Sequence, residues 1–142
     1  LEKATHHGTP YADYLLAQDT LLPWAGNDPG LFWATGSSDF EDSQLSYAVD
    51  ANQNWNHVVV TYSSDAGAKG EKKIYLNCCL VKSGKAGPKT ASNNRPLLIG
   101  AGTNHYGADE CNFWDGEIDD IRIYNRALSL EEVKGLHNLE KP

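Results

Sequence analysis

The stretch with the most pointed chemistry is DGEIDDIRIYNRALS, residues 115–129. Glu117 and Asp119 lie two positions apart, and Asp120 follows at once. On a strand, residues i and i+2 point to the same face, so Glu117 and Asp119 could form a carboxylate pair. Carboxylate pairs hydrolyse glycosidic bonds, and carboxylate oxygens also bind hard cations such as Ca²⁺. The stretch is therefore an active site, a metal site or simply an acidic strand.

The bulk composition limits the class of protein. A chain of 142 residues is long enough for one domain with a real core. The net charge of −7 argues against nucleic acid and against an anionic membrane surface, because both require clustered Lys and Arg. No apolar run approaches the length that spans a bilayer. The sequence contains no Met, so we expect a fragment or a processed product.

The elements that must position the acids are predicted to be mostly strands. The strongest is residues 54–63, whose β-branched run Val58-Val59-Val60-Thr61 suits a pleated, buried surface. Residues 72–84 predict a hairpin with Asn77 and Cys78 at the bend. A two-residue turn usually has Asn-Gly there, so a longer loop is the alternative. The other predicted strands are 11–18, 30–37, 44–51, 95–102 and 112–128.

Only the C-terminal end is predicted to be helical. Ser129 followed by Glu132 forms a capping box, in which each side chain bonds the backbone N–H of the other residue. Leu130, Val133 and Leu136 then form one apolar stripe. Short strands followed by a single terminal helix predict an antiparallel sandwich.

The cysteines are Cys78, Cys79 and Cys111. Three thiols cannot all pair within the chain. We expect one disulfide between Cys111 and one of the adjacent pair, and the alternative is three reduced cysteines that act as small hydrophobic residues.

Four landmarks follow one another along the chain. They are NWNHVVVTY (54–62), KKIYLN-x-x-LV (72–81), PLLIG (96–100) and FWDGEIDDIRIYNRALSLEEV (113–133). This series resembles the LamG-like jelly-roll domains of the concanavalin A-like lectin/glucanase superfamily. The resemblance covers residues 54–137, and LEKA at the start is similar to an earlier strand of the family.

The resemblance implies an all-β fold, a two-sheet antiparallel jelly-roll sandwich with a short C-terminal helix, formed by residues 1–142 as a single domain. The family normally has one or two strands before the point where this chain begins, and they pair with the final strand. We therefore expect a fragment that lacks its first strands. Its sheet would have an open edge, which another chain or a further segment would complete.

The resemblance extends to laminarinase-type glycosidases, whose Glu-x-Asp-x-x-Glu motif begins like Glu117-Ile118-Asp119. The first Glu of that motif is the nucleophile and the last is the general acid/base. Here the last position falls on Arg122, or on Ile121 in the shorter spacing. Neither side chain can donate and recapture a proton near neutral pH, so we expect no catalysis.

A metal is the second possibility for this stretch. The run from Ile118 to Tyr124 is similar to a strand of those glycosidases in which an Asp commonly binds a structural Ca²⁺. By position that Asp is Asp119, and Asp120 is the next candidate. The alternative is that Asp119 accepts backbone or Arg hydrogen bonds at a strand bulge.

Sugar-binding sites on such sandwiches combine aromatic platforms with Asn, Asp and His. The candidates for carbohydrate binding are Trp24, Trp33, Asn104, His105 and Tyr106. The alternative for each is ordinary packing or an ordinary loop. Trp55 and Trp114 occupy family positions held by core aromatics, and we assign both to the core.

The histidines are weaker candidates. His6 and His7 point to opposite faces of an extended chain, so they chelate poorly without further ligands. His57 belongs to the strand 54–63, and we expect a histidine that is satisfied within the sheet rather than a metal ligand.

Together these observations predict a non-catalytic binding module that recognises carbohydrate or a protein partner within a larger extracellular or cell-surface protein. The first alternative is a structural or assembly domain without a ligand of its own. The second is a fragment of a glycoside hydrolase, which the incomplete carboxylate pair disfavours.

Overall fold

The computed structural model describes residues 2–3, 14–19, 30–35, 44–49, 55–66, 70–86, 97–103, 110–111 and 113–140. Its elements in chain order are β1 (Glu2–Lys3), β2 (Tyr14–Asp19), β3 (Gly30–Thr35), β4 (Gln44–Ala48), β5 (Val58–Ser63), β6 (Glu71–Leu76), β7 (Cys79–Lys85), β8 (Gly102–Thr103), β9 (Glu110–Cys111) and α2 (Leu130–Leu139). Among these residues no helix is long and apolar enough to cross a membrane.

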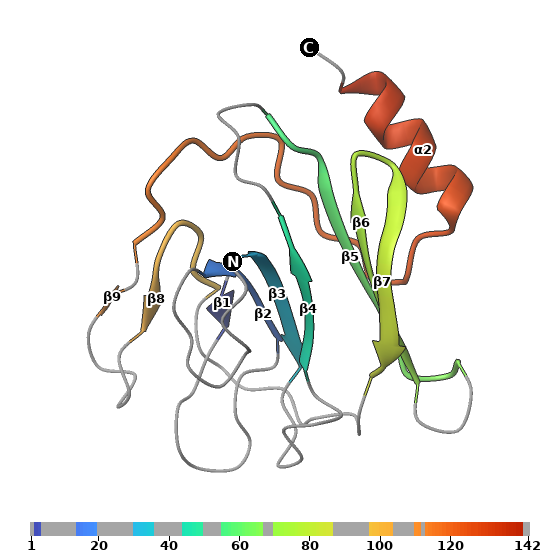
Figure 1. Cartoon of the computed structure of the whole chain (residues 1–142), viewed down its shortest axis with the longest axis horizontal. Helices are drawn as coiled ribbons and strands as arrows, with labels where there is room; N and C mark the ends of the chain where they lie inside the picture. Colours follow the sequence, from blue (N-terminus) through green and yellow to red (C-terminus); the bar gives the residue numbers. More distant parts are fainter. Residues whose placement is uncertain are drawn as a thin grey trace.

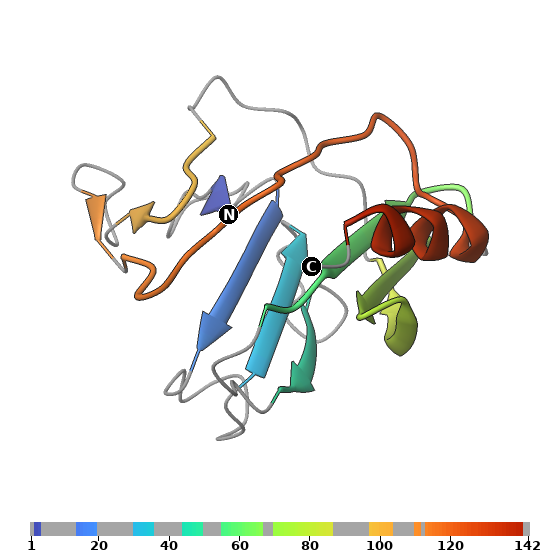
Figure 2. The same ribbon diagram turned by 90° about the horizontal axis from the view of Figure 1, so that it is seen from above.

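The strands form two larger antiparallel sheets and a short third pair. One sheet has the order β1-β2-β3-β4, the second has the order β5-β6-β7, and β8 pairs with β9. The two larger sheets lie side by side, with α2 beyond the second sheet (Figures 1 and 2). This confirms the predicted antiparallel sandwich with a short C-terminal helix.

The β5–β6 pair of the second sheet is packed on both faces. Val58 and Val60 of β5 pack into a cluster whose buried centre is Leu31, Leu45 and Ile74, which joins the two sheets. Val59 lies between them in the sequence and packs instead with Tyr75 and the helix residue Val133. Successive strand residues point to opposite faces, so the uninterrupted valine run fits a strand covered on one side by a sheet and on the other by a helix.

The β6–β7 hairpin has a two-residue turn, which is the shorter of the two arrangements expected from the sequence. Leu76 pairs with Cys79, and the bend between them has positive φ at Asn77 (48°) and Cys78 (66°). Both values belong to the left-handed region that this type of hairpin turn requires. Asn77 tolerates that region well, whereas Cys78 adopts it without the freedom of glycine.

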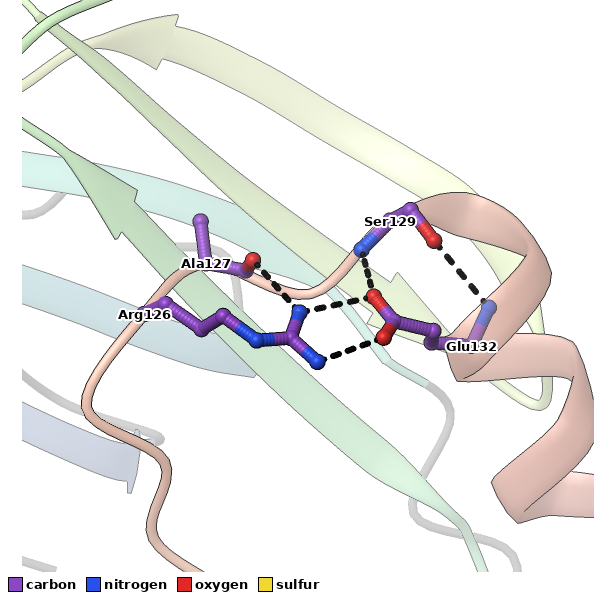
Figure 3. A network of polar contacts seen from close by, with 4 residues as sticks. All are labelled: Arg126, Ala127, Ser129 and Glu132. Carbon is purple, nitrogen blue, oxygen red and sulfur yellow. Dashed lines mark hydrogen bonds and ion pairs between the residues drawn. The ribbon is translucent and has the colours of Figure 1, made fainter.

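Helix α2 begins at the predicted capping box. The Ser129 hydroxyl accepts the N–H of Glu132 at 3.3 Å, and the Glu132 carboxylate accepts the N–H of Ser129 at 2.9 Å. Arg126 adds a two-pronged ion pair to the same carboxylate at 2.9 and 2.6 Å (Figure 3). This pairing, together with the Ser129 bonds, lowers the pKa of Glu132 to about 2.

Two predicted strands are corrected. Residues 95–102 were expected to form a strand, but within the described part only an isolated bridge at Leu98 and the two-residue β8 occur there. Residues 112–128 were expected to form the closing strand, but the described residues 113–128 contain no strand. They run as an irregular chain across the molecule from β9 to α2 (Figures 1 and 2).

The capping box gives the first testable consequence. We expect Ser129→Ala to lower the free energy of unfolding by about 1 kcal/mol, because the N–H of Glu132 loses its acceptor. Urea denaturation followed by circular dichroism measures the change. Ser83→Ala, at an exposed position of β7, is the matched control and should be nearly neutral. Equal stability of the two variants would contradict a role for the cap.

Candidate binding surface

The most unusual surface of the described residues is the segment 113–124. Its large apolar side chains are exposed rather than packed, with Phe113 at 70% and Ile123 at 63% of their full accessibility. The others with substantial exposure are Trp114, Ile118, Ile121 and Tyr124. A soluble protein seldom leaves so many neighbouring apolar side chains uncovered, and such patches mark interaction sites. We call this segment the apolar crossing.

The backbone of the apolar crossing is bonded to another described segment near its start. The N–H of Trp114 donates to the carbonyl of Gly100 at 2.8 Å. Among the described residues, no backbone hydrogen bond joins residues 115–125 to a neighbouring strand. With respect to the described strands, this part of the segment therefore resembles an open sheet edge with exposed apolar side chains.

The acidic residues of the segment do not gather into a metal centre. Glu117, Asp119 and Asp120 are all exposed. The Asp119 carboxylate accepts the N–H of Asp120 at 2.8 Å, and Asp120 has a φ of 49°. This is a backbone hydrogen bond of the kind expected in the alternative for Asp119, but it lies in an irregular segment and not at a strand bulge. Within the described part of the chain, no group of three or more His, Cys, Asp or Glu is placed to hold a metal ion, and calcium stays a prediction.

Arg122 lies where a catalytic acid would be needed, and the structure gives it another partner. Its guanidinium pairs with the carboxylate of Glu140 at the end of α2. The second oxygen of that carboxylate lies 3.2 Å from Nε2 of His57, just before β5. One carboxylate thus ties together the apolar crossing, the helix end and the second sheet. We call His57, Arg122, His137 and Glu140 the helix clamp.

The two imidazoles of the helix clamp are in contact. The rings of His57 and His137 are 5.5 Å apart between centroids and meet edge to face. Nδ1 of each ring is buried and has no hydrogen-bond partner among the described residues. Burial, followed by the proximity of His137 and Arg122, lowers the pKa of His57. The expectation of a satisfied sheet histidine therefore holds for Nε2 but not for Nδ1.

Sequence reasoning missed His137 and Glu140 altogether. They lie three positions apart, His137 in the last turn of α2 and Glu140 at its C-cap, and nothing in their spacing connects them to His57, eighty residues before His137. Only the packing of α2 on the second sheet brings them together. The three-residue spacing, which puts both side chains on one helix face, was the available signal.

The assignment of Trp55 and Trp114 to the core was wrong. Trp55 is 56% exposed and Trp114 is 38% exposed. The Trp114 indole lies beside Gly116, where Nε1 stands 3.0 Å from the place that a Cβ would take. Tryptophan is therefore present at both family positions, but the described residues do not enclose either ring.

The side chains proposed to contact carbohydrate lie outside the described part of the structure. Trp24, Asn104, His105 and Tyr106 lie outside the described residues. Trp33 belongs to β3, where its backbone pairs with Leu16 and Leu45, and its side chain is likewise outside the description. These five residues therefore stay predictions.

The expected disulfide is not formed. Cys78 and Cys79 are free thiols, so the alternative of reduced cysteines holds for this pair. The reason is position: β9, which ends at Cys111, lies at the opposite side of the molecule from the β6–β7 turn in both views (Figures 1 and 2). A disulfide needs Cα atoms within about 7 Å.

A match to a protein-family model identifies the superfamily of this chain. The model of the concanavalin A-like lectin/glucanase superfamily of the Laminin_G_3 type matches residues 7–134. The chain belongs to this superfamily. The superfamily includes both binding modules and glycosidases, so membership establishes the fold and leaves the activity to be argued from the residues. No curated protein matches the chain.

One solved structure is similar to this chain. It is the crystal structure of an S-layer domain-containing protein (residues 221–444) from Clostridium thermocellum ATCC 27405, with 26% identity and a TM-score of 0.44. The match covers 78% of this chain and 52% of that one, so the chain spans about half of the solved domain.

The helix clamp predicts how stability depends on pH. His57 binds a proton less readily in the folded protein than in the unfolded chain, because its pKa is lowered. Its contribution to stability is therefore complete above the ordinary pKa of about 6.5 and is lost as the pH falls through the lowered value. We expect the melting temperature to fall between about pH 7.5 and about pH 5.5, and to fall less in His57→Gln.

Thermal unfolding by circular dichroism across this range measures the effect. The difference between the native chain and His57→Gln isolates His57 from the carboxylates that titrate at lower pH. A melting temperature that rises on acidification, or an identical slope in both proteins, would contradict the assignment.

Proposed function

We propose that the chain is a non-catalytic binding module of a larger extracellular protein, and that it binds a polypeptide partner through the apolar crossing. The observation that carries the proposal is the exposure of the large apolar side chains along residues 113–124. Their burial under a partner would be favourable by roughly 25 cal/mol per Å² of apolar area. The superfamily supports a binding role and an extracellular location.

An extended strand is the form of partner that suits this surface. Residues 115–125 make no backbone hydrogen bond to a neighbouring strand within the described part, and an added strand would supply the missing partners. In an extended chain alternate side chains point in opposite directions. Arg122 pairs with Glu140, the C-cap of α2, while Ile121 and Ile123 on either side of it are exposed. They are the side chains that a partner would cover.

The residues of the acidic stretch support a non-catalytic reading. A retaining glycosidase needs a second carboxyl group about 5 Å from the nucleophile. At the corresponding positions the chain has Ile121, which is exposed, and Arg122, whose guanidinium is paired with Glu140. Glu117 therefore lacks the acid/base partner that its proposed chemistry would require.

Carbohydrate is the second candidate partner, and one observation favours it. Trp55 is exposed and is followed directly by Asn56, whose amide oxygen accepts a hydrogen bond from Asn77 at 3.0 Å. Asn77 is itself fixed, because its side-chain oxygen accepts the N–H of His57 at 3.0 Å. An aromatic ring beside positioned amides is a usual platform for a sugar.

Two further parts of the proposal concern the whole domain. Residues 1–142 form one domain of the superfamily, and the partner strand comes from the same polypeptide or from another chain. A structural calcium ion near Asp119 and Asp120 would then take its remaining oxygen ligands from residues outside the described part.

Selection from a random-peptide display library tests the main proposal. We expect enriched peptides of alternating apolar and polar residues, because an added strand presents every second side chain to the surface. The double variant Ile121→Lys/Ile123→Lys should weaken their binding by about tenfold or more, which corresponds to about 1.4 kcal/mol. Leu80→Lys, at an exposed apolar position of β7, is the matched control and should bind as the native chain does.

Each other outcome points to a different function. Peptide binding that survives the double variant would sink the role of the apolar crossing. Binding on a glycan array that Trp55→Ala removes would favour the carbohydrate candidate. Absence of both kinds of binding would leave the structural or assembly role. Hydrolysis of a polysaccharide that Glu117→Gln abolishes would overturn the non-catalytic assignment.

A further inference from the structure

The helix clamp contains two imidazole nitrogens whose bonding is incomplete. Nδ1 of His57 and Nδ1 of His137 are each buried and have no hydrogen-bond partner among the described residues. A buried nitrogen without a partner costs free energy, so its persistence calls for a ligand or a counterpart. The two atoms belong to elements far apart in the sequence, the start of β5 and the last turn of α2.

The partner of His57 prepares its Nδ1 for metal binding. Nε2 of His57 lies 3.2 Å from the Glu140 carboxylate, so this nitrogen carries the proton and Nδ1 keeps a free lone pair. Histidines that bind metals almost always donate their other N–H to a carboxylate or carbonyl in this way. Glu140 is in turn held by Arg122, which fixes the orientation of the carboxylate.

The spacing of the rings matches two histidines on one ion. Their centroids are 5.5 Å apart. For a tetrahedral zinc ion with Zn–N distances of about 2.0–2.1 Å, the centroids of two bound imidazoles are about 5 Å apart. The observed separation of the two rings is therefore close to that of two imidazoles on one ion.

We propose that His57 and His137 form a two-histidine site for a divalent transition-metal ion of the zinc class, with Glu140 as the carboxylate that orients His57. Within the described part no group of three or more His, Cys, Asp or Glu is placed to hold a metal ion, so the other positions of the ion would be left to water. The ion would join the start of β5 to the last turn of α2. It would thereby fasten the helix over the outer face of the second sheet.

The probe for this site is Zn²⁺ itself, added to the purified chain. Because the ion binds the folded state only, we expect a rise in melting temperature of about 5 °C or more at a hundredfold excess over the dissociation constant. Calorimetric titration should give one ion per chain. Co²⁺ should give the visible absorption of a low-symmetry site that contains nitrogen ligands.

Three variants separate this site from the other histidines of the chain. His57→Gln and His137→Gln should each abolish the rise in melting temperature, and each is first checked for native circular dichroism without metal. If one of them does not fold, the other carries the test. His6→Gln/His7→Gln removes two histidines elsewhere in the sequence and should keep the full response.

The proposal is overturned if the native chain gives no response to Zn²⁺, or if the response survives both single variants. It is equally overturned if His6→Gln/His7→Gln removes the response, since the ion would then belong to the terminal pair. Glu140→Gln should weaken binding without abolishing it, by about tenfold or more, because the carboxylate orients a ligand rather than binding the ion.

Discussion

The packing of β5 and β6 between two different layers is the constraint on which the rest of the structure depends. Val58, Val60 and Ile74 face the first sheet, while Val59 and Tyr75 face α2. The strand pair therefore cannot shift by one residue without exchanging its two apolar faces. That fixed register also sets where α2 lies, and with it the end of the apolar crossing.

The apolar crossing is held mainly at its two ends as a result. Near its start the N–H of Trp114 bonds to Gly100, and beyond its end Leu128 is buried under α2 with Tyr75. Between them, Arg122 pairs with Glu140. A segment with exposed apolar side chains and no strand neighbour among the described residues is poorly stabilised by its own contacts, and this is the physical reason for assigning it to binding.

Local patterns predicted the local structure well. The valine run at 58–60, the bend at Asn77-Cys78 and the Ser129–Glu132 capping box are each determined by neighbouring residues, and each is found where it was expected. The landmarks of the resemblance likewise identified the superfamily, because its last motif is long and specific. These features needed no knowledge of distant contacts.

Features that depend on distant contacts were predicted poorly. Residues 112–128 have the composition of a strand, but a strand forms only where a neighbour pairs with it. Trp55 and Trp114 were assigned to the core because they occupy family positions held by core aromatics, and both are exposed. The helix clamp was missed because His57, Arg122 and Glu140 meet only through the packing of α2 on the second sheet.

The central claim, that residues 115–125 are an unpaired segment beside a well-packed sheet, is tested most directly by hydrogen exchange measured by mass spectrometry. Peptides that cover 115–125 should exchange with little protection, while those that cover β5 and β6 should be strongly protected. Protection of residues 115–125 equal to that of β5 in the isolated chain would mean that the segment is already paired. That result would contradict the assignment of the apolar crossing as a binding surface.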